Sequence, residues 1–138
     1  MIILMCFFVY LVRLFMLVKL LKSKIHNATI TAAKLHYQGS LAVDRSLMAA
    51  AGLLPYEAVI VADITTGSRV QTYVVPAPAE SGKIEVLGAA ARLINPNDTV
   101  IILNFALYAP EEAKKHKPKV LILDKNNKIK SADRCENA

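Results

Sequence analysis

The chain has 138 residues, of which 54% are hydrophobic and 20% are charged. A chain of this length forms one domain with a sizeable core, and this composition excludes disorder as its main description. Its two cysteines, Cys6 and Cys135, lie near opposite ends, which argues against a disulfide framework and indicates a reducing, cytoplasmic setting.

The net charge of +6 is concentrated at the two ends of the chain. Residues 1–26 carry four basic residues and no acid, and residues 114–138 carry eight basic residues and three acids. The middle, residues 27–113, has five basic residues and eight acids. Basic ends around a mildly acidic body are typical of solvated termini. The distribution therefore argues against a nucleic-acid-binding protein.

Residues 1–15 belong to a strongly apolar N-terminal extension. The apolar run is interrupted by Arg13 and Lys19, whereas a membrane-spanning helix needs about 20 consecutive apolar residues. The run also lacks the charged start and the small-residue cleavage site of a signal peptide. Because Met16 offers an alternative start, we interpret residues 1–15 as a dispensable extension from an upstream start site. A peripheral or membrane anchor is the alternative.

The rest of the sequence predicts short strands and few helices. Apolar and β-branched runs predict strands at residues 19–25, 28–35, 41–43, 58–64, 69–75, 83–87, 99–105 and 119–124. Asp44 is a suitable N-cap for a helix that runs to Ala51 and stops at Gly52, and Pro110 begins a second short helix to about His116. Residues 128–138 are a polar tail that we expect to fray.

The order of these elements has no βαβ rhythm. It predicts a mainly β domain, a small barrel of six or seven strands with short helices. We place this domain at residues 16–130 and the end of the polar tail at residues 131–138.

The dipeptide Gly39-Ser40 directly follows an expected strand. A serine hydroxyl can attack the carbonyl of the preceding residue, and a glycine at that position permits the strained geometry that the attack requires. By itself the dipeptide is typical of an ordinary tight turn. Its meaning depends on what stands elsewhere in the chain.

Four motifs supply that context, namely Lys24-Ile25-His26, His36-Tyr37-Gln38-Gly39-Ser40, Arg69-Val70-Gln71-Thr72-Tyr73 and Gly88-Ala89-Ala90-Ala91. In this order and spacing the chain resembles the bacterial aspartate 1-decarboxylases over about residues 19–130. The resemblance implies a double-psi β-barrel that assembles as a cytoplasmic homotetramer with active sites between neighbouring subunits. It also implies conversion of L-aspartate to β-alanine and carbon dioxide in pantothenate biosynthesis.

The resemblance implies that the chain cuts itself between Gly39 and Ser40. Ser40 would become a covalent pyruvoyl cofactor, which forms a Schiff base with the substrate amine and accepts the charge left by carbon dioxide. Whether cleavage needs a maturation factor stays open. An unprocessed barrel that acts as a binding or regulatory subunit is the alternative function.

The resemblance also assigns roles to individual residues. Lys24 and Arg69 would bind the carboxylates of the substrate, because a guanidinium matches a carboxylate in two hydrogen bonds. Tyr73 would return a proton after decarboxylation, since a phenol can donate one while it is neutral near pH 7. Thr72 would lie by the cleavage site, although it points to the opposite face of a regular strand. The backbone of Gly88, Ala89 and Ala90 would close the pocket.

Three further residues, His26, His36 and Tyr37, match family positions, but we assign them no catalytic role. No pair of histidines has the spacing of a metal site, and we expect no metal.

The resemblance breaks at Leu87, where the family commonly has asparagine. If that amide binds the reacting group, its loss costs about 1–3 kcal/mol, or one to two decades in rate. Slow processing and an altered substrate preference are the two consequences to test.

Overall fold

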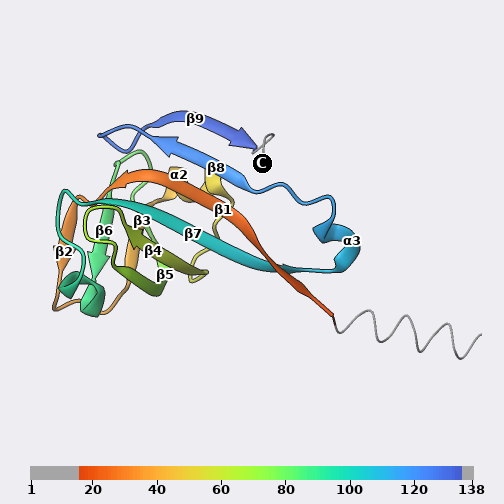
Figure 1. Ribbon diagram of the computed structural model, residues 1–138. Coiled ribbons are helices and arrows are strands. Elements are labelled where there is room, and N and C mark those ends of the chain that lie inside the picture. Colours follow the sequence, from red (N-terminus) through yellow and green to blue (C-terminus); the bar gives the residue numbers. More distant parts are fainter. Residues whose placement is uncertain (1–15, 135–138) are drawn as a thin grey trace, which may run out of the picture.

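The computed structural model describes residues 16–134, and side chains as far as residue 132. The expected extension at residues 1–15 therefore lies outside the described residues. Within residues 16–134 the chain forms nine strands, two α-helices and one 3-10 helix (Figure 1). In chain order they are β1 (Val18–Thr29), β2 (Ala32–Lys34), β3 (Leu41–Asp44), α2 (Arg45–Ala51), β4 (Ala58–Asp63), β5 (Arg69–Ala77), β6 (Ile84–Leu87), η1 (Gly88–Arg92), β7 (Thr99–Tyr108), α3 (Pro110–Ala113), β8 (Lys119–Leu123) and β9 (Ile129–Arg134).

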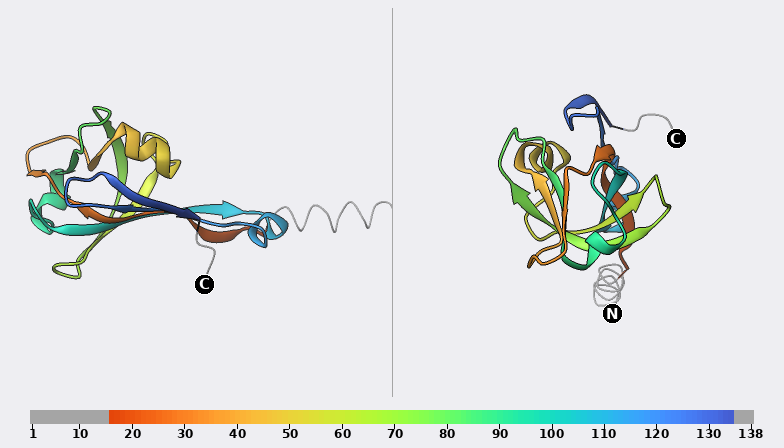
Figure 2. Two further views of the ribbon diagram at one scale, coloured as in Figure 1. Left: turned by 90° about the horizontal axis from the view of Figure 1, so that it is seen from above. Right: turned by 90° about the vertical axis from the view of Figure 1, so that its left-hand side faces the viewer.

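The strands form one hydrogen-bonded series in the order β2-β6-β3-β5-β4-β7-β1-β8-β9. Pairs β1/β8, β2/β6 and β3/β5 are parallel, and the other pairs are antiparallel. The series curls around a common interior, as the right-hand view of Figure 2 shows. This interior is filled by aliphatic side chains, the largest fully buried ones being Ile25, Ile30, Leu41, Ile84, Ile94 and Ile102.

Strand β1 is the longest of the elements in the described part of the chain, and it changes its neighbours along its length. Its first residues, from Val18 to Leu21, pair with β7 alone within the described part of the chain, and the two strands extend beyond the other strands toward α3 (Figure 1). From Ser23 onward β1 also pairs with β8. Two register shifts in the β1/β7 pair mark irregularities, and the second contains Asn27 with φ of 59°. Such bulges bend a strand and increase its twist.

The prediction of a mainly β fold with short helices is confirmed, but the described residues form nine strands rather than six or seven. The expected strand at residues 28–35 is two strands in the structure. The break is at Ile30, whose N–H donates to Asp98 and whose carbonyl accepts from Asn97. These bonds turn the chain from β7 toward β6, where Thr31 donates to the Ile84 carbonyl.

The prediction that residues 128–138 form a fraying polar tail is wrong for residues 129–134. Residues 129–134 form β9, which pairs with β8 in antiparallel fashion from Ile129 to Arg134. Pairing with β8 satisfies the backbone of this segment, and local polarity could not reveal that partner. The helix expected from Pro110 to His116 ends as an α-helix at Ala113. Helix α2 is as predicted, with Asp44 as N-cap and Gly52 as C-cap.

No helix within residues 16–134 is long and apolar enough to cross a membrane.

Candidate active site

Ser40 lies where an irregular segment becomes a central strand. Residues 35–38 are bends, whereas Leu41 pairs with both β5 and β6. Ser40 is only 4% exposed. Its carbonyl accepts a hydrogen bond from the Leu87 N–H at 2.8 Å, and its hydroxyl donates to the carbonyl of Tyr73. Backbone groups of two neighbouring strands therefore hold Ser40, and the bond to Tyr73 leaves the lone pairs of its hydroxyl oxygen unused.

The missing side chains of Gly39 and Gly88 each permit a close approach: Gly39 lies against Leu87, and the Gly39 carbonyl lies against Gly88. A Cβ at residue 39 would lie 3.0 Å from Cδ1 of Leu87. A Cβ at residue 88 would lie 3.0 Å from the carbonyl oxygen of Gly39 and 3.2 Å from that of Tyr37. Gly88 has φ of +70°, a left-handed conformation that glycine adopts readily. A serine with a buried, hydrogen-bonded hydroxyl directly after a glycine fits the chemical requirements of a pyruvoyl precursor.

Strand β5 carries the three other predicted residues of the hairpin. Its register with β4 is continuous from Arg69 to Tyr73, so the strand is regular here, and Thr72 points to the opposite face from Tyr73, as expected of a regular strand. Thr72 is half-buried, whereas Tyr73 is 41% exposed on the opposite face. The ring of Tyr73 lies 6.4 Å from that of Tyr56, centroid to centroid. The Arg69 guanidinium donates to the Gly67 carbonyl at 3.3 Å.

Lys24 lies on the same side of the sheet as Arg69 and Tyr73 but not beside them. The register pairs Lys24 with Leu103, Leu103 with Ile60, and Ile60 with Gln71, and residues paired in this way share a face. Three strand spacings separate Lys24 from Gln71, about 14 Å. Among residues 16–132, no carboxylate forms an ion pair with Lys24 or Arg69. The two cations are therefore available to an anion but lie apart.

The predicted residues thus fall into two groups. The structure brings together the backbone of Gly39, Ser40, Tyr73 and Gly88, with Ala89 and Ala90 following in η1. It leaves Lys24 on β1, three strand spacings from Gln71, which lies between Arg69 and Tyr73 along β5.

The three residues without a predicted catalytic role lie outside the Ser40 contacts. His36 and Tyr37 are exposed in the segment before Gly39. His26 is half-buried, and burial together with the charge of Lys24 lowers its pKa. Within the described residues its Nδ1 atom is buried without a hydrogen-bond partner. A lowered pKa favours the neutral imidazole at neutral pH.

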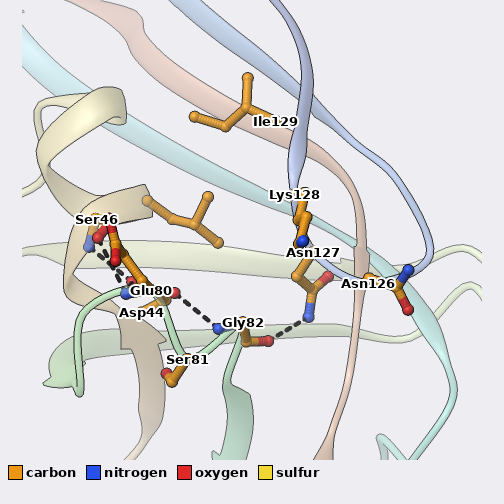
Figure 3. A pocket seen from close by; sticks show the side chains of 10 residues that line it. Asp44, Ser46, Glu80, Ser81, Gly82, Asn126, Asn127, Lys128 and Ile129 are labelled. Atoms are coloured by element: carbon orange, nitrogen blue, oxygen red, sulfur yellow. Dashed lines mark hydrogen bonds between the residues drawn. The ribbon is translucent and has the colours of Figure 1, made fainter.

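A cavity of about 520 Å³ lies at the other end of β3, near Asp44 (Figure 3). The Asp44 carboxylate there accepts from the N–H groups of Ser46, Glu80 and Gly82 at 2.7, 3.0 and 2.8 Å. Burial alone would raise the pKa of Asp44, but these three bonds outweigh burial and lower it. The side-chain amide of Asn127 is also committed to structure. It accepts from the N–H of Thr29 and donates to the carbonyls of Thr29 and Gly82. The polar groups of this junction hold the fold together, so we assign it no chemistry.

Within residues 16–134, no group of three or more histidine, cysteine or acidic side chains is arranged to hold a metal ion.

Sequence reasoning missed two contacts at Ser40. The acceptor of its hydroxyl is the main-chain carbonyl of Tyr73, and the donor to its carbonyl is the main-chain N–H of Leu87. Main-chain groups carry no signal in the residue type, so only the strand register reveals them. The sequence identifies Leu87 as a departure from a family pattern but does not reveal its contact with Gly39.

Comparison with known proteins identifies the family to which the chain is similar. The family model described as aspartate decarboxylase matches residues 16–130. An aspartate 1-decarboxylase of Phenylobacterium zucineum is 50% identical over 117 residues, which cover 85% of this chain and 99% of that protein. One of Clostridium beijerinckii is 47% identical over 122 residues, covering 88% and 98%. One of Lactiplantibacillus plantarum is 47% identical over 121 residues, covering 88% and 93%.

Proposed function

The chain belongs to the aspartate decarboxylase family, and from this membership we propose that it converts L-aspartate to β-alanine and carbon dioxide, a step of pantothenate biosynthesis. It acts after it has cut itself between Gly39 and Ser40. The observation that carries this proposal is the family match over residues 16–130 together with the buried, oriented hydroxyl of Ser40 directly after Gly39.

The self-cleavage uses only groups of this chain and one water molecule. The hydroxyl oxygen of Ser40 adds to the carbonyl carbon of Gly39, the peptide C–N bond breaks, and the hydroxyl proton ends on the nitrogen of Ser40. Loss of the Ser40 α-proton then breaks the new ester and releases Gly39 as a carboxylate. Water replaces the nitrogen of the remaining group, which leaves as ammonia. The products are a chain that ends at Gly39 and a chain that begins with a pyruvoyl group.

The pyruvoyl group supplies a ketone that acts as an electron sink when carbon dioxide departs. The chain's own residues bind and orient the substrate. Arg69 offers two parallel N–H donors to one carboxylate, and Lys24 offers a second positive charge. Tyr73 donates a proton to the carbon that loses carbon dioxide, for which its 41% exposure leaves it accessible. Thr72 and the backbone of Gly88, Ala89 and Ala90 border the same end of β5 and β6.

A homotetramer with shared sites is part of the proposal. Within one chain Lys24 lies three strand spacings, about 14 Å along the sheet, from Gln71, so a substrate bound by Arg69 beside Tyr73 would receive its second cation more easily from a neighbouring copy. The face between them also favours a second copy, because its side chains are apolar and half-exposed. These side chains are Ile60, Ile101, Leu103 and Phe105. We place the enzyme in the cytoplasm.

Intact-mass measurement and a β-alanine assay of the purified chain test the proposal together. We expect two fragments whose masses sum to that of the uncut chain plus water minus ammonia, whereas plain hydrolysis adds water alone. Slow cleavage that a cell extract accelerates would indicate a maturation factor. A chain that stays uncut and forms no β-alanine even with extract would contradict the proposal and favour the unprocessed binding or regulatory subunit.

Mixing two inactive variants tests the shared site. Lys24→Ala and Tyr73→Phe chains, expressed together, should recover activity if Lys24 and Tyr73 of one site come from different copies. Expressed separately, both should be poorly active. Recovery no greater than the sum of the separate activities would mean that each copy supplies both residues.

A further inference from the structure

The dipeptide Leu87-Gly88 contacts both residues of the bond to be cut. Leu87 is 3% exposed and packs with Ala42, Val75 and Ala77 in a small cluster outside the main core. Its N–H donates to the Ser40 carbonyl at 2.8 Å, on one side of the bond. Its side chain lies on the other side, with Cβ and Cδ1 at 3.4 and 3.0 Å from the position that a Cβ of Gly39 would take. Leu87 therefore limits movement on both sides of the Gly39-Ser40 bond.

Gly88 contacts the carbonyl group that Ser40 must attack. The oxygen of Gly39 lies 3.0 Å from the position of a Cβ on residue 88, and the oxygen of Tyr37 lies 3.2 Å from it. Both are main-chain atoms, which cannot rotate away as the end of a long side chain can. A side chain at residue 88 would require the Gly39 carbonyl to shift by a few tenths of an ångström.

The position of that carbonyl decides the rate of an intramolecular attack. A displacement of about 1 Å at the reacting atoms can cost about 100-fold in rate. Two hydrogen bonds oppose a compensating movement of Ser40, because its carbonyl is bonded to β6 and its hydroxyl to β5. The angle between the hydroxyl and the carbonyl is thus set by what holds Gly39.

We infer that Leu87 and Gly88 are positioning residues for self-cleavage: Gly88 provides the space in which the Gly39 carbonyl lies, and Leu87 holds Gly39 and Ser40 around it. This inference rests on the proposed function, since it concerns the cleavage that forms the cofactor. It adds a role in maturation to the part that Gly88 has in closing the substrate pocket.

The rate of cleavage in a Gly88→Ala chain tests the inference, with Gly67→Ala as matched control. Gly67 has φ of +76° and nothing within 4 Å of its Cβ position, so the control introduces the same backbone strain without the clash. We expect cleavage of Gly88→Ala to be several-fold slower than that of Gly67→Ala, because a shift of a few tenths of an ångström at the Gly39 carbonyl raises the activation free energy of the attack. Both chains are produced in full length and followed by denaturing gel and intact mass.

Adding hydroxylamine shows whether a variant is slow in the attack by the Ser40 hydroxyl or in the later breakdown of the ester. It cleaves the ester that forms after the attack, so it restores cleavage only if the attack itself is fast. We expect hydroxylamine not to bring Gly88→Ala to the level of the control. Equal rates for the two variants, or full recovery with hydroxylamine, would overturn the role of Gly88. Cleavage that fails in the unaltered chain would instead contradict the proposed function.

A second pair of variants keeps the inference testable if Gly88→Ala does not fold. Leu87→Ala removes the contact with Gly39, and Leu53→Ala removes a leucine of similar burial, 5% exposed, from the main core. We expect Leu87→Ala to cleave several-fold more slowly than Leu53→Ala when both are folded. Equal cleavage of these two chains would overturn the role of Leu87.

Discussion

The two ends of strand β3 each carry a buried polar residue, and they are held in different ways. Ser40, 4% exposed, enters the strand with one hydrogen bond from its hydroxyl to a carbonyl. Asp44, 3% exposed, leaves the strand with three N–H groups bonded to its carboxylate. The carboxylate is committed to structure, whereas the hydroxyl oxygen keeps lone pairs that can react. Hydrogen-bonding capacity left over, more than burial, distinguishes the reactive end of β3 from the structural end.

Substitutions at the two ends of β3 should therefore have different consequences. A change at the reactive end should stop chemistry and leave the fold, and a change at the structural end should weaken the fold and leave the chemistry of the folded fraction. The variants below are ordered by the size of the effect that we expect.

Ser40→Ala should abolish both cleavage and decarboxylation, because the hydroxyl is the nucleophile and the source of the cofactor. The chain should stay whole on a denaturing gel and unfold at a temperature close to that of the uncut chain with Ser40. Ser81→Ala, at an exposed serine whose hydroxyl donates to the Pro78 carbonyl, should cleave normally. Activity of Ser40→Ala comparable to that of the unaltered enzyme would rule out a pyruvoyl mechanism.

Tyr73→Phe should cleave itself but decarboxylate poorly. Its main-chain carbonyl, which binds the Ser40 hydroxyl, is unchanged, whereas the proton donor is lost, at a cost of about 100- to 10,000-fold in kcat. Tyr56→Phe, at the exposed tyrosine whose ring neighbours Tyr73, is the control and should keep most of the activity. If cleavage and decarboxylation fell together in Tyr73→Phe, the side chain would act in maturation as well.

Asp44→Asn should lower the free energy of unfolding by about 1–3 kcal/mol at neutral pH, because an amide cannot replace the carboxylate toward all of its N–H partners. Urea unfolding of the Ser40→Ala chain, with and without the second change, measures this without interference from cleavage. Asp98→Asn should cost less, since the Asp98 carboxylate accepts only from Asn95 among the main-chain hydrogen bonds described. Equal losses would mean that the junction at Asp44 contributes no special stability.

The stabilisation by Asp44 should depend on pH with a defined sign. Its pKa is lowered in the folded chain, because three N–H bonds outweigh the opposite effect of burial. Its contribution is therefore complete above the unfolded pKa, about 3.9, and is lost as the pH falls through the folded value. The difference between Asp44 and Asp44→Asn chains should narrow below about pH 4. A difference that stayed constant through this range would assign the stabilisation to packing.

Leu87→Asn should have the smallest effect, and it should be a gain. The main-chain N–H that binds Ser40 is kept, and the amide adds a polar group next to Gly39, which could raise kcat by up to about 10-fold. Decarboxylation of aspartate and of its homologue glutamate by the two chains, measured after full cleavage, checks both rate and preference. A slower Asn variant would show that this chain has adapted its pocket to leucine.

Most local structure around the site could be predicted from residue types. Asp44 and Gly52 mark the two ends of α2, and the apolar runs on either side of Thr66-Gly67 form the β4/β5 hairpin. Each of these signals lies within a few residues of the structure that it specifies. The split of residues 28–35 at Ile30 and the pairing of β9 with β8 could not be predicted in this way, because partners distant in the sequence supply their hydrogen bonds.

For the reactive centre, the sequence by itself determined which groups are available: a serine after a glycine, two cations, a phenol, and a glycine-alanine run, at spacings that match one family. Tertiary structure alone decided how they are used. It bonded the Ser40 hydroxyl to the Tyr73 carbonyl, set Gly88 against the carbonyl of Gly39, and put Lys24 three strand spacings from Gln71. The reason is physical, because main-chain contacts depend on strand register and are the same for every residue type.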